Sequence, residues 1–278
     1  MGAANVIPGV SGGTIALLTG IFERLIHAIS ACNISALQLL LKGQFKAFSR
    51  QIDLLFLFAI IIGILLSILS LARLLEFLFI DYKLMVWAYF FGLILASVYY
   101  VGKNIRQFSI STYILFLIGT ITAASMTWLT PSVGSTSTIY LLICGAIAMC
   151  SMILPGLSGS FILLLMGNYE IIINAVGNLY LPVLVPFGTG AILGALFFAK
   201  LLSWIFKNYH DQTIAILTGF IFGSLGILWP WKVAYTESLG YQYQLPTAST
   251  ETWIAILLII IGIGTIASIE ITSKKRNS

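Results

Sequence analysis

The chain has 278 residues, of which 59% are hydrophobic and 8% charged, and its formal net charge is +5. Soluble domains carry about 25% charged residues, so this chain cannot cover a water-facing surface and must turn apolar surface toward lipid. Its basic residues lie in short loops, as topology signals do, which argues against nucleic-acid binding. We therefore expect an all-α polytopic membrane protein, since a helix satisfies its own backbone hydrogen bonds in lipid.

Nine apolar segments follow one another along the chain, several of them near the 20 residues that cross a bilayer core of about 30 Å. They are 14–31, 54–79, 84–101, 112–130, 138–154, 159–176, 182–206, 212–230 and 252–271. Between the first two, residues 36–46 mix Leu and Phe with Lys42 and Lys46, which predicts an amphipathic helix lying in the membrane interface. The long polar loop at 232–251 is the candidate for an ordered external loop.

The basic residues predict the orientation. If Lys42, Lys46 and Arg50 are cytoplasmic, alternating crossings bring the later basic clusters, at 103–106, 207 and 274–276, to the same side. The multi-pass chain then ends in the cytoplasm. Segment 138–176 can dip into the membrane or cross it twice, because both preserve this arrangement.

Two blocks of sequence repeat. Residues 8–23 and 155–170 share Pro, Gly, Ser and Glu at one spacing, and Gly63–Ser97 aligns without gaps with Gly190–Ser224. Each half is a broken segment followed by three crossings, so the halves face opposite ways, as in many secondary transporters. We expect one membrane domain over 1–278 with two inverted-topology repeats, 1–130 and 131–278. The first is N-terminally shortened, since nothing in it matches 138–154.

The repeated Pro-Gly-x-Ser-Gly segments are the predicted substrate site. Proline ends one helix, and a new one is expected after Gly12 or Gly159. A helix N-terminus presents free N–H groups and a positive dipole end, which suit a phosphate or carboxylate. The predicted binding residues are Pro8, Gly9, Ser11, Gly12, Gly13 and Thr14 in the first segment and Pro155, Gly156, Ser158, Gly159 and Ser160 in the second.

Helix length predicts the depth of these breaks. A continuous helix from Gly12 to Glu23 would be about 16 Å long, which is half of the bilayer core. Each break would then lie near the midplane, with Glu23 and Glu170 at the surface. The alternative is that the small residues only allow close helix packing.

The ionisable residues of the segments are candidate gating or coupling groups: Glu23, Arg24 and Glu170. The alternative is an interfacial helix end with a local Glu23–Arg24 pair. Arg73 and Lys200 could guide an anionic head group, or snorkel to the interface. His27 and His210 have no evident partner. The spacing of the Cys, His and acidic residues predicts no metal site, no catalytic residue and no cofactor.

At these motifs the chain resembles a known family. Asn5-Val6-Ile7-Pro8-Gly9-Val10-Ser11-Gly12-Gly13-Thr14, then Thr19-Gly20-Ile21-Phe22-Glu23-Arg24, are similar to the first signature of the PopT-type polyprenyl-phosphate transporters. Pro155-Gly156-Leu157-Ser158-Gly159 with Gly167-Asn168-Tyr169-Glu170 resembles the second, and Phe90-Phe91-Gly92-Leu93 and Thr218-Gly219-Phe220 are also typical. The resemblance implies transport of undecaprenyl phosphate across the bacterial cytoplasmic membrane, for recycling of the carrier lipid.

Four functions are weighed. The leading one is a polyprenyl-phosphate flippase, surrounded by membrane lipids, with H⁺ or Na⁺ as the candidate coupling ion. A secondary transporter of a small soluble anion would instead need an aqueous cavity closed from lipid. A membrane enzyme such as a lipid phosphatase would need a nucleophile, a base or a metal cluster. An assembly factor would not need paired helix breaks. The sequence does not fix the oligomeric state.

Overall fold

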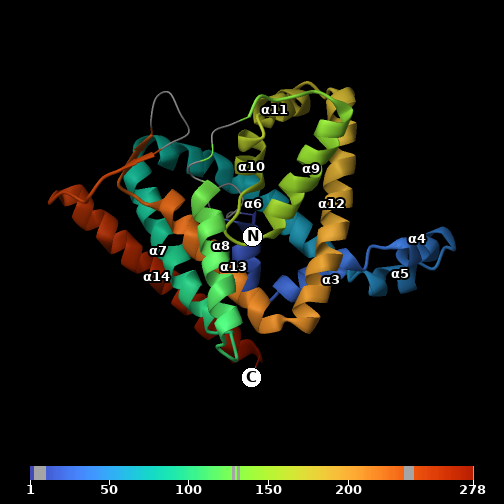
Figure 1. Cartoon of the computed structure of the whole chain (residues 1–278), viewed down its shortest axis with the longest axis horizontal. Helices are drawn as coiled ribbons and strands as arrows, with labels where there is room; N and C mark the ends of the chain where they lie inside the picture. Colours follow the sequence, from blue (N-terminus) through green and yellow to red (C-terminus); the bar gives the residue numbers. More distant parts are fainter. Residues whose placement is uncertain (3–10, 127–128, 130–131, 235–240, 278) are drawn as a thin grey trace.

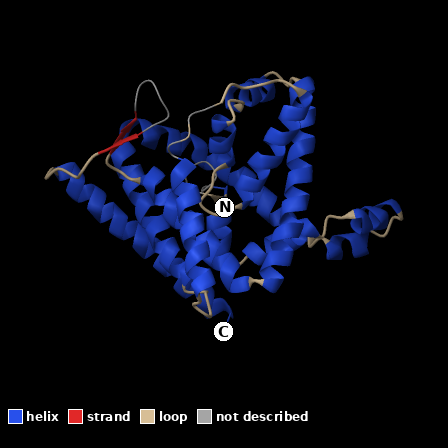
Figure 2. Cartoon of the chain, in the orientation of Figure 1, coloured by secondary structure: helices blue, strands red, loops and turns tan. Residues whose placement is uncertain are grey.

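Helices make up nearly all of the structure. The computed structural model describes residues 1–2, 11–126, 129, 132–234 and 241–277, and Figure 2 shows helices throughout, apart from one short hairpin. Within these residues, five helices are long and apolar enough to cross a membrane, which confirms five of the predicted spans. They are α6 (Leu54–Asp81), α7 (Lys83–Gly102), α12 (Leu181–Asn208), α13 (His210–Leu228) and α14 (Thr250–Asn277).

The other elements are shorter. Two are apolar helices, α8 (Ile110–Ser125) and α9 (Thr138–Ile153). Two are bent pairs, α2 (Gly12–Leu18) with α3 (Phe22–Ser30) and α10 (Gly159–Leu165) with α11 (Tyr169–Gly177). If each bent pair counts as one span, up to seven cross. The strands β1 (Lys232–Ala234) and β2 (Tyr241–Tyr243) form an antiparallel hairpin, with Val233 opposite Gln242, in the predicted external loop.

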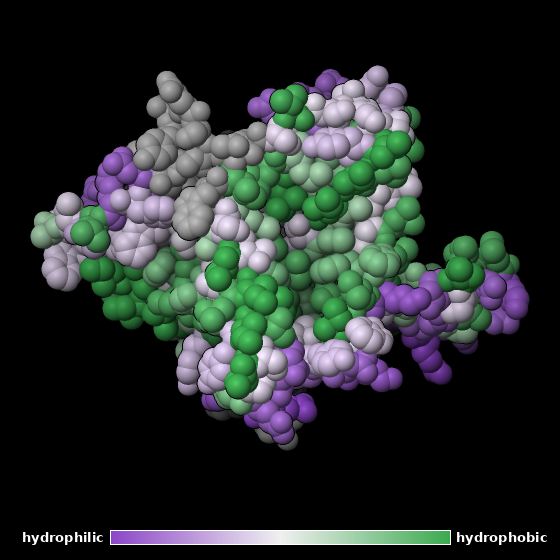
Figure 3. Space-filling model, in the orientation of Figure 1, coloured by the Kyte–Doolittle hydropathy of each residue, from purple (hydrophilic) through white to green (hydrophobic). Residues whose placement is uncertain are grey.

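The surface is divided into bands. In the space-filling view, apolar side chains cover the middle of the molecule and polar ones gather toward its upper and lower edges (Figure 3). Such a band between two polar rims is what a membrane-spanning protein needs. The lower rim contains α3, the α7–α8 loop, the α12–α13 junction and the end of α14, and α11 lies at the upper rim (Figure 1).

Three helix pairs pack closely through glycines. A side chain added at Gly92 or Gly262 would collide with the facing backbone between α7 and α14, and Gly119, Gly219 and Gly223 have the same role between α8 and α13. Gly145, Gly190 and Gly194 bring α9 against α12. Small residues allow such contact where the surrounding lipid gives no hydrophobic drive to pack. The main core cluster joins α2, α3, α6, α7, α12, α13 and α14 and includes Phe22, Ile26, Trp87 and Phe206.

One predicted helix is divided in two. Residues 36–46 do not form a single amphipathic helix: α4 (Ile34–Leu41) ends at Lys42, and α5 (Phe45–Gln51) starts after a turn at Gly43, whose φ is +72°. The two helices project from the body as an arm (Figure 1), with apolar side chains on one side and polar ones on the other (Figure 3). The interfacial character is retained, because Leu37, Leu41 and Phe45 are exposed.

The bent pairs correct the depth argument. New helices do begin at Gly12 and Gly159, as the Pro-Gly breaks predict. They do not continue to Glu23 and Glu170, because each has 7 residues, about 10 Å, and the chain then turns by 117° or 115°. The predicted midplane position of the breaks assumed continuous helices from Gly12 to Glu23 and from Gly159 to Glu170. The structure has no such continuous helices, so that estimate of depth does not apply.

The two turns have the same geometry. Gly20 and Gly167 adopt φ of +70° and +71°. In the first, the Gly20 N–H donates to Leu17 O and the Ile21 N–H to Ala16 O, and in the second Gly167 and Asn168 donate in the same pattern. This is the Schellman motif, which ends a helix with a left-handed residue that glycine adopts without strain. α3 and α11 then lie at opposite rims of the molecule (Figure 1).

Candidate functional site

The two repeated segments contact each other directly. The Thr14 hydroxyl accepts a hydrogen bond from the Gly156 N–H at 3.1 Å, and the Ser11 hydroxyl lies 3.2 Å from the Leu154 carbonyl, to which it donates. Ser11 also caps α2 by accepting from the Gly13 N–H at 3.1 Å. Thr14 and Ser11 are 0% and 3% exposed. The first segment is therefore locked against the backbone of the second.

Glycines allow this close approach. A Cβ at Gly13 would lie 2.5 Å from the Ile153 carbonyl oxygen, and one at Gly156 would lie 2.6 Å from the Phe220 oxygen on α13. Gly156 also has a φ of +80°, which other residues rarely adopt. Gly12, Gly13, Pro155 and Gly156 are buried. Close packing is thus present at these positions, and it is compatible with a binding role as well.

The second segment keeps its hydroxyls closer to the surface. Ser158 is the N-cap of α10, accepting from the Phe161 N–H at 3.5 Å, and its hydroxyl lies 2.8 Å from that of Ser160. Ser160 is exposed, and Ser158 and Gly159 are half-buried. α9 reaches the middle of the molecule and α10 returns toward the rim it started from (Figure 1). The two serines therefore lie at the inner turn of the α9–α10 hairpin.

Some predicted residues lie outside the described part. Pro8 and Gly9 fall within 3–10, and the side chain of Arg73 is also not described, so their predicted roles stay predictions. Lys200 is exposed on α12 and lines a surface hollow of about 710 Å³ together with residues from the α3–α4 turn and the start of α4, including Asn33 and Ser35. That hollow is separate from the contact between the two segments.

Glu23 has a partner that the sequence did not reveal. Its Oε1 lies 3.3 Å from His210 Nε2, and His210 Nδ1 lies 3.3 Å from the Asp211 carboxylate. Asp211 in turn accepts from the backbone N–H groups of Arg106 and Gln107, each at 3.1 Å. The expectation that His210 lacks a partner was wrong. A pairing across so many residues leaves no spacing signal in the sequence.

A small polar cavity of about 230 Å³ opens beside this chain of contacts. Glu23, Asn104, Arg106 and His210 line it, together with Leu17, Gly20, Phe22 and Ile214. The carboxylate, the guanidinium and the imidazole thus face one space where α2 turns into α3. The three side chains together offer hydrogen-bond donors and an acceptor to a polar ligand in this cavity.

Arg24 and Glu170 behave differently from Glu23. Arg24 Nε lies 2.6 Å from Asp53 Oδ2, and its guanidinium stacks over the Phe56 ring at 4.3 Å, so it ties α3 to the start of α6 instead of pairing with Glu23. The Arg24 guanidinium holds the pKa of the Asp53 carboxyl below its ordinary value. Glu170 is exposed and forms no ion pair with the residues that the structure describes.

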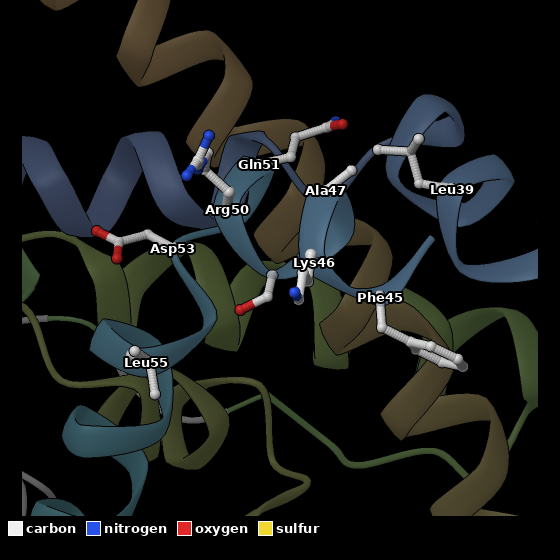
Figure 4. A pocket seen from close by; sticks show the side chains of 9 residues that line it. Leu39, Phe45, Lys46, Ala47, Arg50, Gln51, Asp53 and Leu55 are labelled. Carbon is white, nitrogen blue, oxygen red and sulfur yellow. The ribbon is translucent and has the colours of Figure 1, made fainter. Parts of the chain in front are cut away.

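A broad shelf of about 1060 Å³ lies where the arm joins the body. Lys46, Arg50 and Asp53 line it from α5 and the start of α6, and the Phe45 ring projects away from Arg50 and Asp53 (Figure 4). Its mixture of basic and apolar side chains suits the lipid head-group region. Across the described residues, no group of three or more His, Cys, Asp or Glu side chains could hold a metal ion.

Comparison with known proteins decides the family. A family model described as undecaprenyl phosphate translocase-like matches residues 1–243. The chain belongs to this family. It is 38% identical over 291 residues to a polyprenyl-phosphate transporter of Vibrio cholerae serotype O1, covering 99% of this chain and 94% of that protein. It is 30% identical over 282 residues to a polyprenyl-phosphate transporter of Staphylococcus aureus, covering 94% and 90%. No solved structure matches it.

Membership settles the class of the protein. This translocase-like chain is a multi-pass membrane transporter with bacterial relatives, and it is not an enzyme, so the resemblance and the exclusion of a lipid phosphatase are both confirmed.

Proposed function

We propose that this chain moves undecaprenyl phosphate, or a closely related polyprenyl phosphate, across the bacterial cytoplasmic membrane, with the phosphate passing between the two Pro-Gly-x-Ser-Gly segments. The observation that carries this proposal is the direct contact between the segments, through Thr14 to the Gly156 N–H and Ser11 to the Leu154 carbonyl. Helix N-termini that meet inside a membrane protein form a favourable place for an anion.

The contact represents a closed state in this proposal. The hydroxyls of Ser11 and Thr14 are used by the opposite segment, whereas Ser158 and Ser160 bond each other near the surface. A phosphate therefore meets the serines of the second segment first. It reaches the first segment only when Thr14 separates from Gly156. Binding of the phosphate replaces the hydrogen bonds that the separation breaks.

Two inverted halves, 1–130 and 131–278, supply the motion in this proposal. Helix contacts support them: Gly92 on α7 packs against Ile259 on α14, and its repeat match Gly219 on α13 packs against Phe116 on α8. Gly262 on α14 meets Tyr89, and Gly119 on α8 meets Ile216, which is the residue aligned with Tyr89. The same contact recurring at aligned positions is expected if the halves are related by a pseudo-two-fold axis.

The Glu23–His210 pair is the proposed coupling site. Glu23 lies 3.3 Å from His210, beside Arg106 in the polar cavity, so a coupling cation, H⁺ or Na⁺, that binds the Glu23 carboxylate would displace His210 and bias one state. Glu170, which is exposed at the opposite rim, is the weaker candidate. The gathering of basic loops at the lower rim in Figure 1 supports a cytoplasmic position for that rim and for the C-terminus.

A reconstituted system tests the function. Purified protein is placed in liposomes with a labelled polyprenyl phosphate, and external phosphatase reports the amount in the outer leaflet over time. We expect the protein to speed transbilayer exchange at least tenfold over protein-free liposomes, and a pH or Na⁺ gradient to alter the rate. The second candidate, a transporter of a small soluble anion, is favoured if the lipid does not move and the same vesicles take up inorganic phosphate.

A further inference from the structure

An apolar groove of about 520 Å³ lies between α7, α8 and the middle of α13. The ends of these helices meet at the lower rim in Figure 1. Four aromatic side chains line it: Tyr99, Phe108, Tyr113 and Phe116. Tyr99, Phe108 and Tyr113 are more than half exposed, so the groove is open along its length rather than closed inside the core. Its volume is in the range of small-molecule sites.

The interior of the groove offers apolar surface even where its residues are polar. Thr112 and Thr218 both line it, but the Thr112 hydroxyl donates to the Ser109 carbonyl and the Thr218 hydroxyl to the Ile214 carbonyl, each at 2.7 Å. Only their methyl groups remain for a ligand. The groove follows α8 from Thr112 to Phe116, a distance of about 6 Å.

Charge lies at one end of this groove. Lys103 lines its rim and is exposed. Residues of the same loop alternate between two cavities: Lys103 and Ile105 face the apolar groove, and Asn104 and Arg106 face the polar cavity that contains Glu23 and His210. An apolar channel with a cation at its mouth, next to a polar cavity with a guanidinium, complements a molecule with an anionic head and an apolar chain.

We propose that this groove binds the head-proximal isoprene units of the polyprenyl phosphate in the leaflet at the basic rim, with the phosphate paired to Lys103. This inference rests on the proposed function and adds to it the site where the lipid docks before or after it crosses. The rest of the chain stays in the bilayer, because the groove is far shorter than a polyprenyl chain. The aromatic walls discriminate a methyl-branched chain by shape.

A groove-filling variant tests the proposal. A Cβ at Gly102 would make an ordinary contact, 3.5 Å from the Thr218 methyl, so Gly102→Phe fills the groove without forcing the backbone apart. Gly264→Phe is the matched control, because nothing lies within 4 Å of a Cβ there. Lys103→Gln removes the cation, and Lys207→Gln is its control at the same rim. We expect Gly102→Phe and Lys103→Gln to slow lipid exchange at least fivefold, and the controls to stay within twofold.

Photo-crosslinking separates this inference from the proposed function. A polyprenyl phosphate with a diazirine near its head is bound to the wild-type protein in detergent, and labelled peptides are identified by mass spectrometry. We expect label in residues 98–116, lost in Gly102→Phe and displaced by unlabelled polyprenyl phosphate but not by equal phosphatidylglycerol. Equal displacement by phosphatidylglycerol would show a general lipid groove and overturn the proposal.

The two assays have distinct combined outcomes. If the wild type moves the lipid and Gly102→Phe moves it equally fast with label elsewhere, the groove inference is wrong and the proposed function stands. If the wild type moves no lipid but residues 98–116 are specifically labelled, the binding site stands and the proposed function is wrong. If the wild type moves no lipid and residues 98–116 are not specifically labelled, both proposals are wrong.

Discussion

At the residue scale, the structure separates groups that hold the fold from groups that are free to act. Ser11 and Thr14 resemble substrate ligands in the sequence, yet their hydroxyls bond the backbone of the second segment. Ser158 and Ser160 have the same residue type but remain near the surface. The two segments have similar sequences, so the same binding role was predicted for both. The similarity does not show that Ser11 and Thr14 are buried against the second segment.

The Thr14 contact predicts a stability effect. Thr14→Val keeps the side-chain shape but leaves the buried Gly156 N–H without its acceptor, which costs about 1–3 kcal/mol. We expect a lower thermal midpoint in detergent and slower lipid exchange. Thr122→Val is the control, since the exposed Thr122 hydroxyl only donates to Ile118 in its own helix. Equal midpoints for the two variants would show that the bond between the segments contributes nothing.

The buried ammonium of Lys232 is expected to make the folding stability depend on pH. Its ammonium lies 3.6 Å from the centroid of the buried Trp87 ring, and burial, with a smaller contribution from Lys83, lowers the pKa of Lys232 to about 7. Between pH 7 and its ordinary pKa of 10.5, the unfolded chain holds more protons at this site than the folded one, so the site favours folding more as pH rises.

The pH dependence at Lys232 predicts the effect of replacing this residue. Lys232→Met removes a charge that is costly to bury below pH 7, so it raises the thermal midpoint most at pH 6 and by less at pH 9. Lys46→Met, at an exposed position on the arm, is the control and should show no such trend. A rise in thermal midpoint that is larger at pH 9 than at pH 6 would contradict the lowered pKa of Lys232. The measurement is a thermal-shift series in detergent at the two pH values.

At the element scale, the broken helices are the decisive feature. The Pro-Gly pairs predicted where α2 and α10 begin, because proline and glycine act locally. The turns at Gly20 and Gly167 were missed, because apolar residues continue on both sides of them and mask the C-terminal glycine signal. Each glycine is followed by an amphipathic helix that lies at a rim, with Phe22 and Ile26 of α3 buried and Glu23 exposed.

The two turns should respond unequally to alanine. Gly20→Ala meets no atom within 4 Å, so only its positive φ is unfavourable, by about 1–2 kcal/mol. Gly167→Ala has the same φ penalty, and its new methyl would also collide with the Ser132 carbonyl and with Gly134. We expect a clearly larger drop in thermal midpoint for Gly167→Ala. Equal drops in thermal midpoint would mean that the loop at 132–135 moves to accommodate the new methyl group without loss of stability.

At the scale of the whole molecule, the sequence predicted three crossings in each half because hydropathy is a property of each segment alone, and five of these six are long apolar helices in the structure, the exception being α8. It could not predict which helices pair, since α8 with α13 and α7 with α14 bring together residues far apart in the chain. The Glu23–His210 pair was missed for the same reason. The proposed halves meet at the 11–14 and 154–156 contact, and we expect them to rock about it.

Orientation is testable with single cysteines. In a background lacking Cys32, Cys144 and Cys150, we expect Gln242→Cys in β2 to react with an impermeant maleimide from outside intact cells. Gln44→Cys on the arm should react only after the membrane is opened, because both positions are exposed and the basic arm is expected on the cytoplasmic side. The reverse labelling pattern would invert the topology.

The most direct test of the central claim, that the phosphate passes between the two segments, uses the serines that the closed state leaves near the surface. Lipid exchange is measured for Ser158→Ala/Ser160→Ala in proteoliposomes and compared with Ser70→Ala/Ser268→Ala, whose exposed hydroxyls bond only their own helices. We predict at least a tenfold loss of exchange for the first double variant, a thermal midpoint within a few degrees of wild type, and wild-type exchange for the second. Wild-type exchange by a folded Ser158→Ala/Ser160→Ala protein would contradict the claim and place the path of the head group elsewhere.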